Sequence, residues 1–140
     1  DQHTLETSHD PLLCDQQHYL QQEAHAYAFY VDNTVAGECI YWPGSINHQR
    51  NTWPLDEQKP ILVQLFTLPS MRGRGIATQL ISASHHDMVK NGFPHIHARV
   101  WHSNTASKRA FEKAGWKQTA LAFEINPFRR QQPIRFQYRF

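Results

Sequence analysis

The sequence predicts a mixed α/β domain, with strands and helices in the order β-β-β-α-β-α-β-β. Three observations support this prediction. Runs of β-prone residues come first, two segments with helical spacing of apolar residues follow with a strand between them, and two more β-prone runs close the chain. With 140 residues, 40% of them apolar, the chain is long enough for one domain with a single buried core.

The first part of the chain is expected to hold a poorly defined segment and then a hairpin. Residues 1–23 are rich in Gln and His, and one short helix is expected there, at 12–22. Residues 24–140 are expected to form a single domain. Within it, β-prone runs at 24–31 and 35–42 flank an Asp-Asn-Thr sequence. A turn-forming cluster between two such runs is typical of an antiparallel hairpin.

A proline-containing loop and a buried strand follow. Residues 43–60 hold three prolines among polar residues. A loop of this length within a compact domain often covers a binding site. Residues 61–68 are almost continuously apolar and end at Pro69, which predicts a central strand covered on both faces.

The next segment, residues 75–90, has apolar residues at helical spacing, and Asn91-Gly92 predicts its C-terminal end. The buried stripe of this helix is expected to hold Ile76, Leu80, Ile81, Ala83, Ser84, Met88 and Val89.

The last part of the chain predicts a strand, a helix and a hairpin. Residues 95–101 alternate between two faces, which predicts a strand. Its core face is expected to hold Ile96, Ala98 and Val100. A helix is expected to begin at Asn104 and to end before Gly115. The β-prone runs 118–125 and 134–140 are expected to pair as a hairpin.

Composition and charge argue against several classes of protein. The formal charge of +2 is too small to indicate nucleic acid or an anionic membrane surface as a partner. No apolar run approaches the roughly 20 residues that span a bilayer. Two cysteines, Cys14 and Cys39, are too few for a disulfide framework, so we expect reduced thiols in a cytoplasmic protein, with one bridge between them as the alternative. The chain has no initiator methionine, which is compatible with a trimmed piece of a longer protein.

The most informative feature is the turn between the strand at 61–68 and the helix at 75–90, with the sequence RGRG at 72–75. Glycines let the backbone approach a ligand closely. The free N–H groups and the dipole at a helix start favour an anion, and arginines add forked donors. The turn matches neither the dinucleotide-binding fingerprint nor the Walker loop. Taken alone, the turn favours the simpler interpretation, an ordinary tight turn with two solvent-exposed arginines, because glycine-containing turns are common.

Two motifs resemble those of the GNAT acyltransferase superfamily. The pattern Arg72-x-x-Gly75-x-Ala77 resembles the family's R/Q-x-x-G-x-G/A signature, with its proline lead-in at Pro69. A second block, NTASKRAFEKAGW at 104–116, resembles the family's N-x-x-A/S-x-x-x-Y/F-x-K-x-G-F segment. Both motifs occur in the family's order, one strand apart.

The resemblance implies a fold and a coenzyme site. The fold would be a GNAT-like central mixed β-sheet with flanking helices over residues 24–140, with an abbreviated part in residues 1–23. The co-substrate would be acetyl-CoA or another acyl-CoA. The implied coenzyme contacts are Phe66, Thr67, Leu68, Arg72, Gly73, Arg74, Gly75, Ile76, Ala77, Thr78, Asn104, Ser107 and Lys113.

These contacts would have different roles. The backbone at the end of the central strand would contact the pantetheine arm. Backbone N–H groups of 72–77, with the Thr78 hydroxyl, would hold the pyrophosphate. Asn104 and Ser107 would lie near the pantetheine or thioester end, and Lys113 near the nucleotide phosphates. Asn104 can also serve as a helix N-cap, and both roles can hold together.

The chain departs from the family pattern at its catalytic positions. Many members carry a carboxylate base where this chain has Gln64, which cannot accept a proton, and a tyrosine acid where it has Phe111. The catalytic candidates that remain are Gln64, as the positional equivalent, and His97 and His102 near the end of the strand at 95–101.

The sequence therefore indicates an N-acyltransferase, and among these an N-acetyltransferase, working by direct transfer from acyl-CoA to an amine in a ternary complex. The acceptor would be a small-molecule amine or a protein amine, and Asp56-Glu57 favours a cationic one. Two alternatives stay open: a non-catalytic acetyl-CoA-binding regulatory domain, and a module of a larger protein. No metal is expected, because His95-x-His97 has no third ligand. A homodimer is compatible with the sequence.

Overall fold

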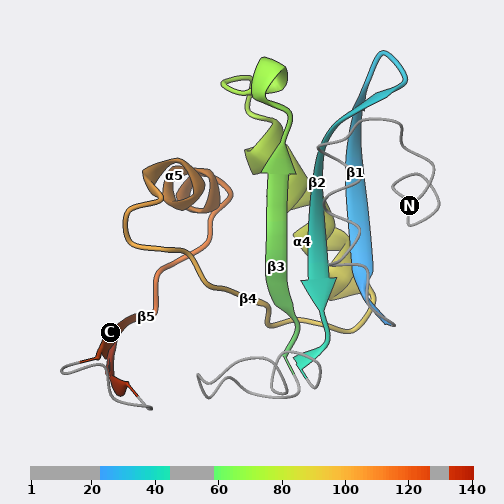
Figure 1. The fold of residues 1–140 in the computed structure, drawn as a ribbon. Helices are drawn as coiled ribbons and strands as arrows, with labels where there is room; N and C mark the ends of the chain where they lie inside the picture. The colour runs from blue at the N-terminus through green and yellow to red at the C-terminus, as the bar shows by residue number, and fades with distance from the viewer. Residues whose placement is uncertain (1–22, 45–58, 127–132) are drawn as a thin grey trace.

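The computed structural model of the chain describes residues 23–44, 59–126 and 133–140 (Figure 1). The helix expected at 12–22 and most of the long loop after residue 43 lie outside these residues. The described elements are β1 (His25–Val31), β2 (Thr34–Trp42), β3 (Ile61–Thr67), the 3₁₀-helix η2 (Pro69–Met71), α4 (Ile76–Lys90), β4 (His97–Ala98), α5 (Thr105–Lys113), β5 (Ala120–Ile125) and β6 (Ile134–Arg139). The predicted mixed α/β fold and the predicted order of its strands and helices are confirmed.

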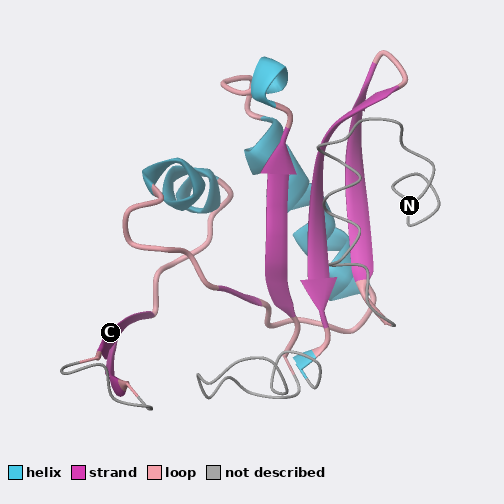
Figure 2. Ribbon diagram, viewed as in Figure 1, coloured by secondary structure: helices cyan, strands magenta, loops and turns pink. Residues whose placement is uncertain are grey.

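The main sheet has the strand order β1-β2-β3-β4. β1 pairs with β2 and β2 pairs with β3 in antiparallel orientation, whereas β4 runs parallel to β3. α4 covers one face of this sheet, whereas α5 lies beside β3 (Figure 1). β5 and β6 pair as the predicted hairpin, in a separate two-stranded sheet on the side of the molecule away from β1 (Figure 2). Neither described helix is long and apolar enough to cross a bilayer.

The first hairpin forms because of its two turn residues. Asp32 and Asn33 have φ values of 47° and 62°, the left-handed conformation that a two-residue type I′ turn requires at both central positions. Asn and Asp adopt this conformation more readily than other residues with a side chain. The predicted hairpin at 24–42 is therefore confirmed, and its turn aligns the two strands.

The strand predicted at 95–101 is much shorter than expected. Only His97 and Ala98 pair with β3, opposite Ile61 and Leu62 at its start. The predicted alternation still holds, because Ile96, Ala98 and Val100 pack against the core. The pairing stops early because the chain leaves the edge of β3 after Ala98. Within the described residues, the rest of the β3 edge has no strand paired to it and lies beside α5 (Figure 1).

α4 packs on the sheet through a narrower stripe than expected. Its buried residues are Ile76, Leu80, Ile81, Ser84 and Met88. Ala83 and Val89 are exposed, so the expectation for these two was wrong. Each follows or precedes a buried residue by one position, which turns it by about 100° around the helix.

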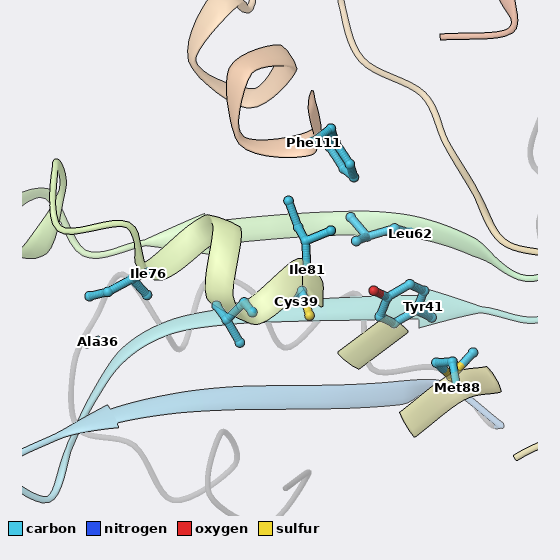
Figure 3. Close-up of a cluster of buried hydrophobic side chains, with 9 residues drawn as sticks. Ala36, Cys39, Tyr41, Leu62, Ile76, Ile81, Met88 and Phe111 are labelled. Carbon is cyan, nitrogen blue, oxygen red and sulfur yellow. The ribbon is translucent and has the colours of Figure 1, made fainter. Parts of the chain in front are cut away.

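Ser84 of α4 forms a small polar cluster inside the core with Cys39 and Tyr41 of β2. Figure 3 shows these two β2 side chains among the buried apolar residues. The Ser84 hydroxyl donates its single proton to the Leu80 carbonyl at 2.6 Å. Its oxygen can therefore accept from the Tyr41 hydroxyl at 2.6 Å and from the Cys39 thiol at 3.4 Å. This arrangement satisfies the buried polar groups and sets the rotation of α4 on the sheet.

The start of α4 lies very close to β2 at Gly37. A Cβ atom at this position would lie 2.9 Å from the Phe66 carbonyl oxygen, 3.1 Å from Ile76 Cγ2 and 3.2 Å from Leu80 Cδ1. The first of these atoms belongs to the backbone of β3 and cannot rotate away. Gly37 therefore lets the end of β3 and the first turn of α4 approach β2 together.

We predict that Gly37→Ala destabilises the protein by about 1–3 kcal/mol, because the added methyl group overpacks this contact. Chemical denaturation monitored by circular dichroism measures the change. The matched control is Ser82→Ala on the exposed face of α4, which should change stability by less than about 0.5 kcal/mol. Equal stability of Gly37→Ala and the native protein would contradict the packing described here.

Candidate functional site

The turn between β3 and α4 is built from two glycines in a left-handed conformation. Gly73 and Gly75 both have φ of 77°, which residues with a Cβ rarely adopt. A Cβ at Gly73 would have no atom within 4 Å, so the backbone conformation, not crowding, requires glycine there. The turn directs the chain from the end of β3 straight into α4.

The first turn of α4 presents backbone donors that the helix does not use. Its first intrahelical bond runs from the N–H of Gln79 to the carbonyl of Gly75, and no side chain caps the helix. The N–H groups of Ile76, Ala77 and Thr78 therefore have no intrahelical acceptor. No acidic residue occupies this turn, so the positive end of the helix dipole is not neutralised there.

A cavity of about 510 Å³ opens between this turn, the end of β3 and α5. Its lining residues are Leu65, Phe66, Thr67, Met71, Arg72, Gly73, Gly75, Ile76, Ala77, Thr78, Asn104, Ala106, Ser107, Arg109, Ala110 and Lys113. The cavity exists because β4 pairs with β3 only at Ile61 and Leu62 and leaves the later part of that edge uncovered. Most of the coenzyme contacts implied by the sequence meet here.

The charged side chains that line the cavity are all positive: Arg72, Arg109 and Lys113. Arg72 is held in place by its Nε, which donates to the Thr67 carbonyl oxygen at 3.2 Å. Together with the backbone donors of α4, these cations favour an anionic ligand. Arg109 and Met71 were not predicted as site residues. The one-turn spacing of Arg109 and Lys113 on α5, i and i+4, is the signal that could have found Arg109.

The start of α5 is fixed by Asn104, whose Oδ1 accepts from the N–H of Ser107 at 3.1 Å. This is the N-cap that the sequence predicts for this position. Both Asn104 and Ser107 also line the cavity. The cap therefore holds these two polar residues at the cavity wall.

Two of the implied coenzyme contacts do not line the cavity. Leu68 is buried, and its N–H already donates to the Ala36 carbonyl oxygen at 2.9 Å. Arg74 lies on the turn, is exposed and is not a lining residue.

The three catalytic candidates also lie away from the cavity lining. Gln64 lies on β3, directly opposite Ile40 of β2. His97 pairs at the start of β3, roughly 20 Å along the strand from Thr67 at its other end. His102 is exposed in the turn before α5. The structure therefore does not gather these three residues into one constellation.

Phe111, which takes the place of the family's tyrosine acid, is a core residue. It is 8% exposed, and its ring lies 5.0 Å from that of Trp116, centre to centre. The Cys39 thiol is free and buried, and burial raises its pKa to about 12. A thiol that stays protonated at neutral pH is no nucleophile, so Cys39 is a core residue as well.

One buried acidic residue was not predicted. Glu38 of β2 is fully buried, and neither of its carboxylate oxygens has a hydrogen-bond partner within the described residues. Burial raises the pKa of this carboxyl to about 7. The signal was present in the sequence, because Glu38 is the single charged residue within the apolar run of β2. Among the described residues, no group of three or more His, Cys, Asp or Glu side chains could hold a metal ion.

The fold and this site can be compared with known proteins. A bisubstrate-analogue complex of AAC(6')-Iy has a TM-score of 0.58 with this chain and 23% identity, over 82% of this chain and 78% of the other. The ribosomal-protein-alanine N-acetyltransferase of Brucella melitensis biovar Abortus 2308 has a TM-score of 0.52 and 17% identity, over 86% of this chain and 87% of the other. The aminoglycoside 6'-N-acetyltransferase AAC(6')-Ih of Acinetobacter baumannii has a TM-score of 0.54 and 14% identity, over 84% of this chain and 87% of the other.

At these identities the likeness to the three structures establishes the fold. No curated protein matches the sequence significantly. The model of the acetyltransferase (GNAT) family, however, matches residues 2–116, which is most of the chain. The chain therefore belongs to the GNAT acetyltransferase family and is an N-acyltransferase of that family.

Proposed function

We propose that the cavity binds acetyl-CoA and that the protein transfers its acetyl group directly to an amine of a small molecule or of a protein. The observation that supports this proposal is that three cationic side chains and the unused backbone N–H donors of α4 surround one cavity. The cations are Arg72, Arg109 and Lys113. A pyrophosphate and a nucleotide phosphate are anions that such a site suits. In the transfer, the amine nitrogen attacks the thioester carbonyl carbon, the C–S bond breaks and coenzyme A leaves.

The coenzyme would lie along the cavity in a fixed direction. The N–H groups of Ile76, Ala77 and Thr78 would hold the pyrophosphate, with Arg72 beside them. Arg109 and Lys113 on α5 would meet the remaining phosphate charge. The edge of β3 that β4 leaves uncovered would face the pantetheine arm. A cytoplasmic location and a homodimer stay predictions.

We predict that acetyl-CoA binding depends on the cations of the cavity. The Arg72→Ala/Arg109→Ala double variant should weaken binding by about 100-fold or more, because it loses two charge-assisted contacts and each costs about 1.5–3 kcal/mol. Isothermal titration calorimetry measures the affinity. The control is Lys90→Ala, which removes one charge from the exposed C-terminal end of α4 and should bind as the native protein does. Equal weakening by the control would mean that only the overall charge matters.

We predict that the native protein releases coenzyme A from acetyl-CoA when a suitable amine is present. A thiol-release assay would use aminoglycosides and a peptide that begins with alanine, because the similar structures include enzymes named for these acceptors. Mass spectrometry should find one acetyl group on the acceptor. Tight acetyl-CoA binding without transfer to any amine would support the non-catalytic alternative instead.

A further inference from the structure

The buried carboxylate of Glu38 has no structural explanation within the part of the chain that the structure describes. Its side chain is 0% exposed, and both of its oxygens lack hydrogen-bond partners there. An unpaired carboxylate in an apolar environment is unfavourable, whereas an apolar side chain would simply fill the space. The residues that follow it on β2, from Cys39 to Trp42, are all buried and carry no charge. Such an isolated, perturbed acid is typical of a functional group.

Glu38 lies next to the position from which the family's base acts. It is paired with Phe66 of β3, which lines the cavity, while Gln64 is paired with Ile40, two residues from Glu38. Glu38 and Gln64 are therefore diagonal neighbours on one face of the sheet, about 7–8 Å apart. This face points away from α4, because Cys39 and Tyr41, the alternate residues of β2, pack on the α4 side. Glu38 itself is fully buried and does not line the cavity, so its link to the cavity is its neighbour Phe66.

We propose that Glu38 is the proton acceptor of the reaction, a role that its neighbour Gln64 cannot perform. This inference rests on the proposed acetyl transfer. The acceptor enters as an ammonium ion and gives one proton to the Glu38 carboxylate through a bridging water, because the carboxylate is buried beside the cavity and does not line it. The neutral amine then attacks the thioester carbonyl carbon. When the C–S bond breaks, the leaving thiolate takes the second proton from nitrogen, and Glu38 later returns its proton to solvent.

The surroundings of Glu38 suit this role. The described side chains nearest to it on its face are Ala28 of β1, Ile40 of β2, and Gln64 and Phe66 of β3, none of which titrates. Its neighbour along the chain, Cys39, faces the other side and keeps its proton at neutral pH. None of these neighbours carries a charge that would stabilise the carboxylate. Burial raises its pKa to about 7, and the positive charge of the N-terminal amino group lowers it by a smaller amount. A base that titrates near the working pH is best placed for proton transfer.

Glu38→Gln tests this proposal because it keeps the size of the side chain and removes its basicity. We expect kcat to fall by about 100-fold or more, while calorimetric acetyl-CoA binding stays unchanged. In the native protein, kcat/KM should fall as pH drops through about 7, because a protonated base cannot act. This acidic limb should be missing from Glu38→Gln. The Glu38→Gln/Gln64→Glu double variant should recover part of the lost kcat, since it places a carboxylate at the neighbouring position.

The outcomes separate this proposal from the proposed function. Native kcat retained by a folded Glu38→Gln variant would overturn the role of Glu38 and leave acetyl transfer standing. Lost activity without rescue by Gln64→Glu, and with the acidic limb still present, would mark Glu38 as structural only. If Glu38→Gln does not fold, the pH profile of the native enzyme decides, and a profile flat between pH 6 and 8 overturns the proposal, since this window brackets a base that titrates at about 7. No transfer by the native protein at all would overturn the proposed function, and this inference with it.

Discussion

The close contact between the start of α4 and β2 at Gly37 determines where the site lies. Because this residue has no Cβ, the Phe66 carbonyl and the Ile76 side chain can both approach β2. The end of β3 and the first turn of α4 are thereby held against the same strand, with the glycine turn between them. The unused N–H groups of α4 then face the cavity beside β3, where Arg72, Arg109 and Lys113 add positive charge.

Much of this could be predicted from the sequence, because local chemistry determines it. Asn33 in the first hairpin and Gly75 in the second turn were both placed in turns from residue type, and both have positive φ in the structure. Asn104 was predicted as an N-cap and is one. The glycine turn and the second motif are also local patterns, so the family and most of the cavity lining followed from them.

The remaining features depend on tertiary packing, which a local pattern does not contain. Alternation predicted a strand at 95–101, but only two of its residues pair with β3, because the chain turns away toward α5. Arg109 lines the cavity only because the fold places α5 across the cavity from the end of β3. Glu38 lies beside Gln64 through the register of β2 on β3, which is set across a long connection. The candidates from the sequence, Gln64, His97 and His102, lie on other elements, so the acid on the strand adjacent to Gln64 was missed.

The central claim is that the glycine turn and the first turn of α4 hold the coenzyme. Titration of isotope-labelled protein with coenzyme A, followed by amide chemical shifts in nuclear magnetic resonance spectra, tests it most directly. The account predicts that the largest shift changes fall on Gly73, Gly75 and the N–H groups of 76–78, with smaller changes at the start of α5. Largest changes on the β5–β6 hairpin, with the turn unaffected, would contradict it.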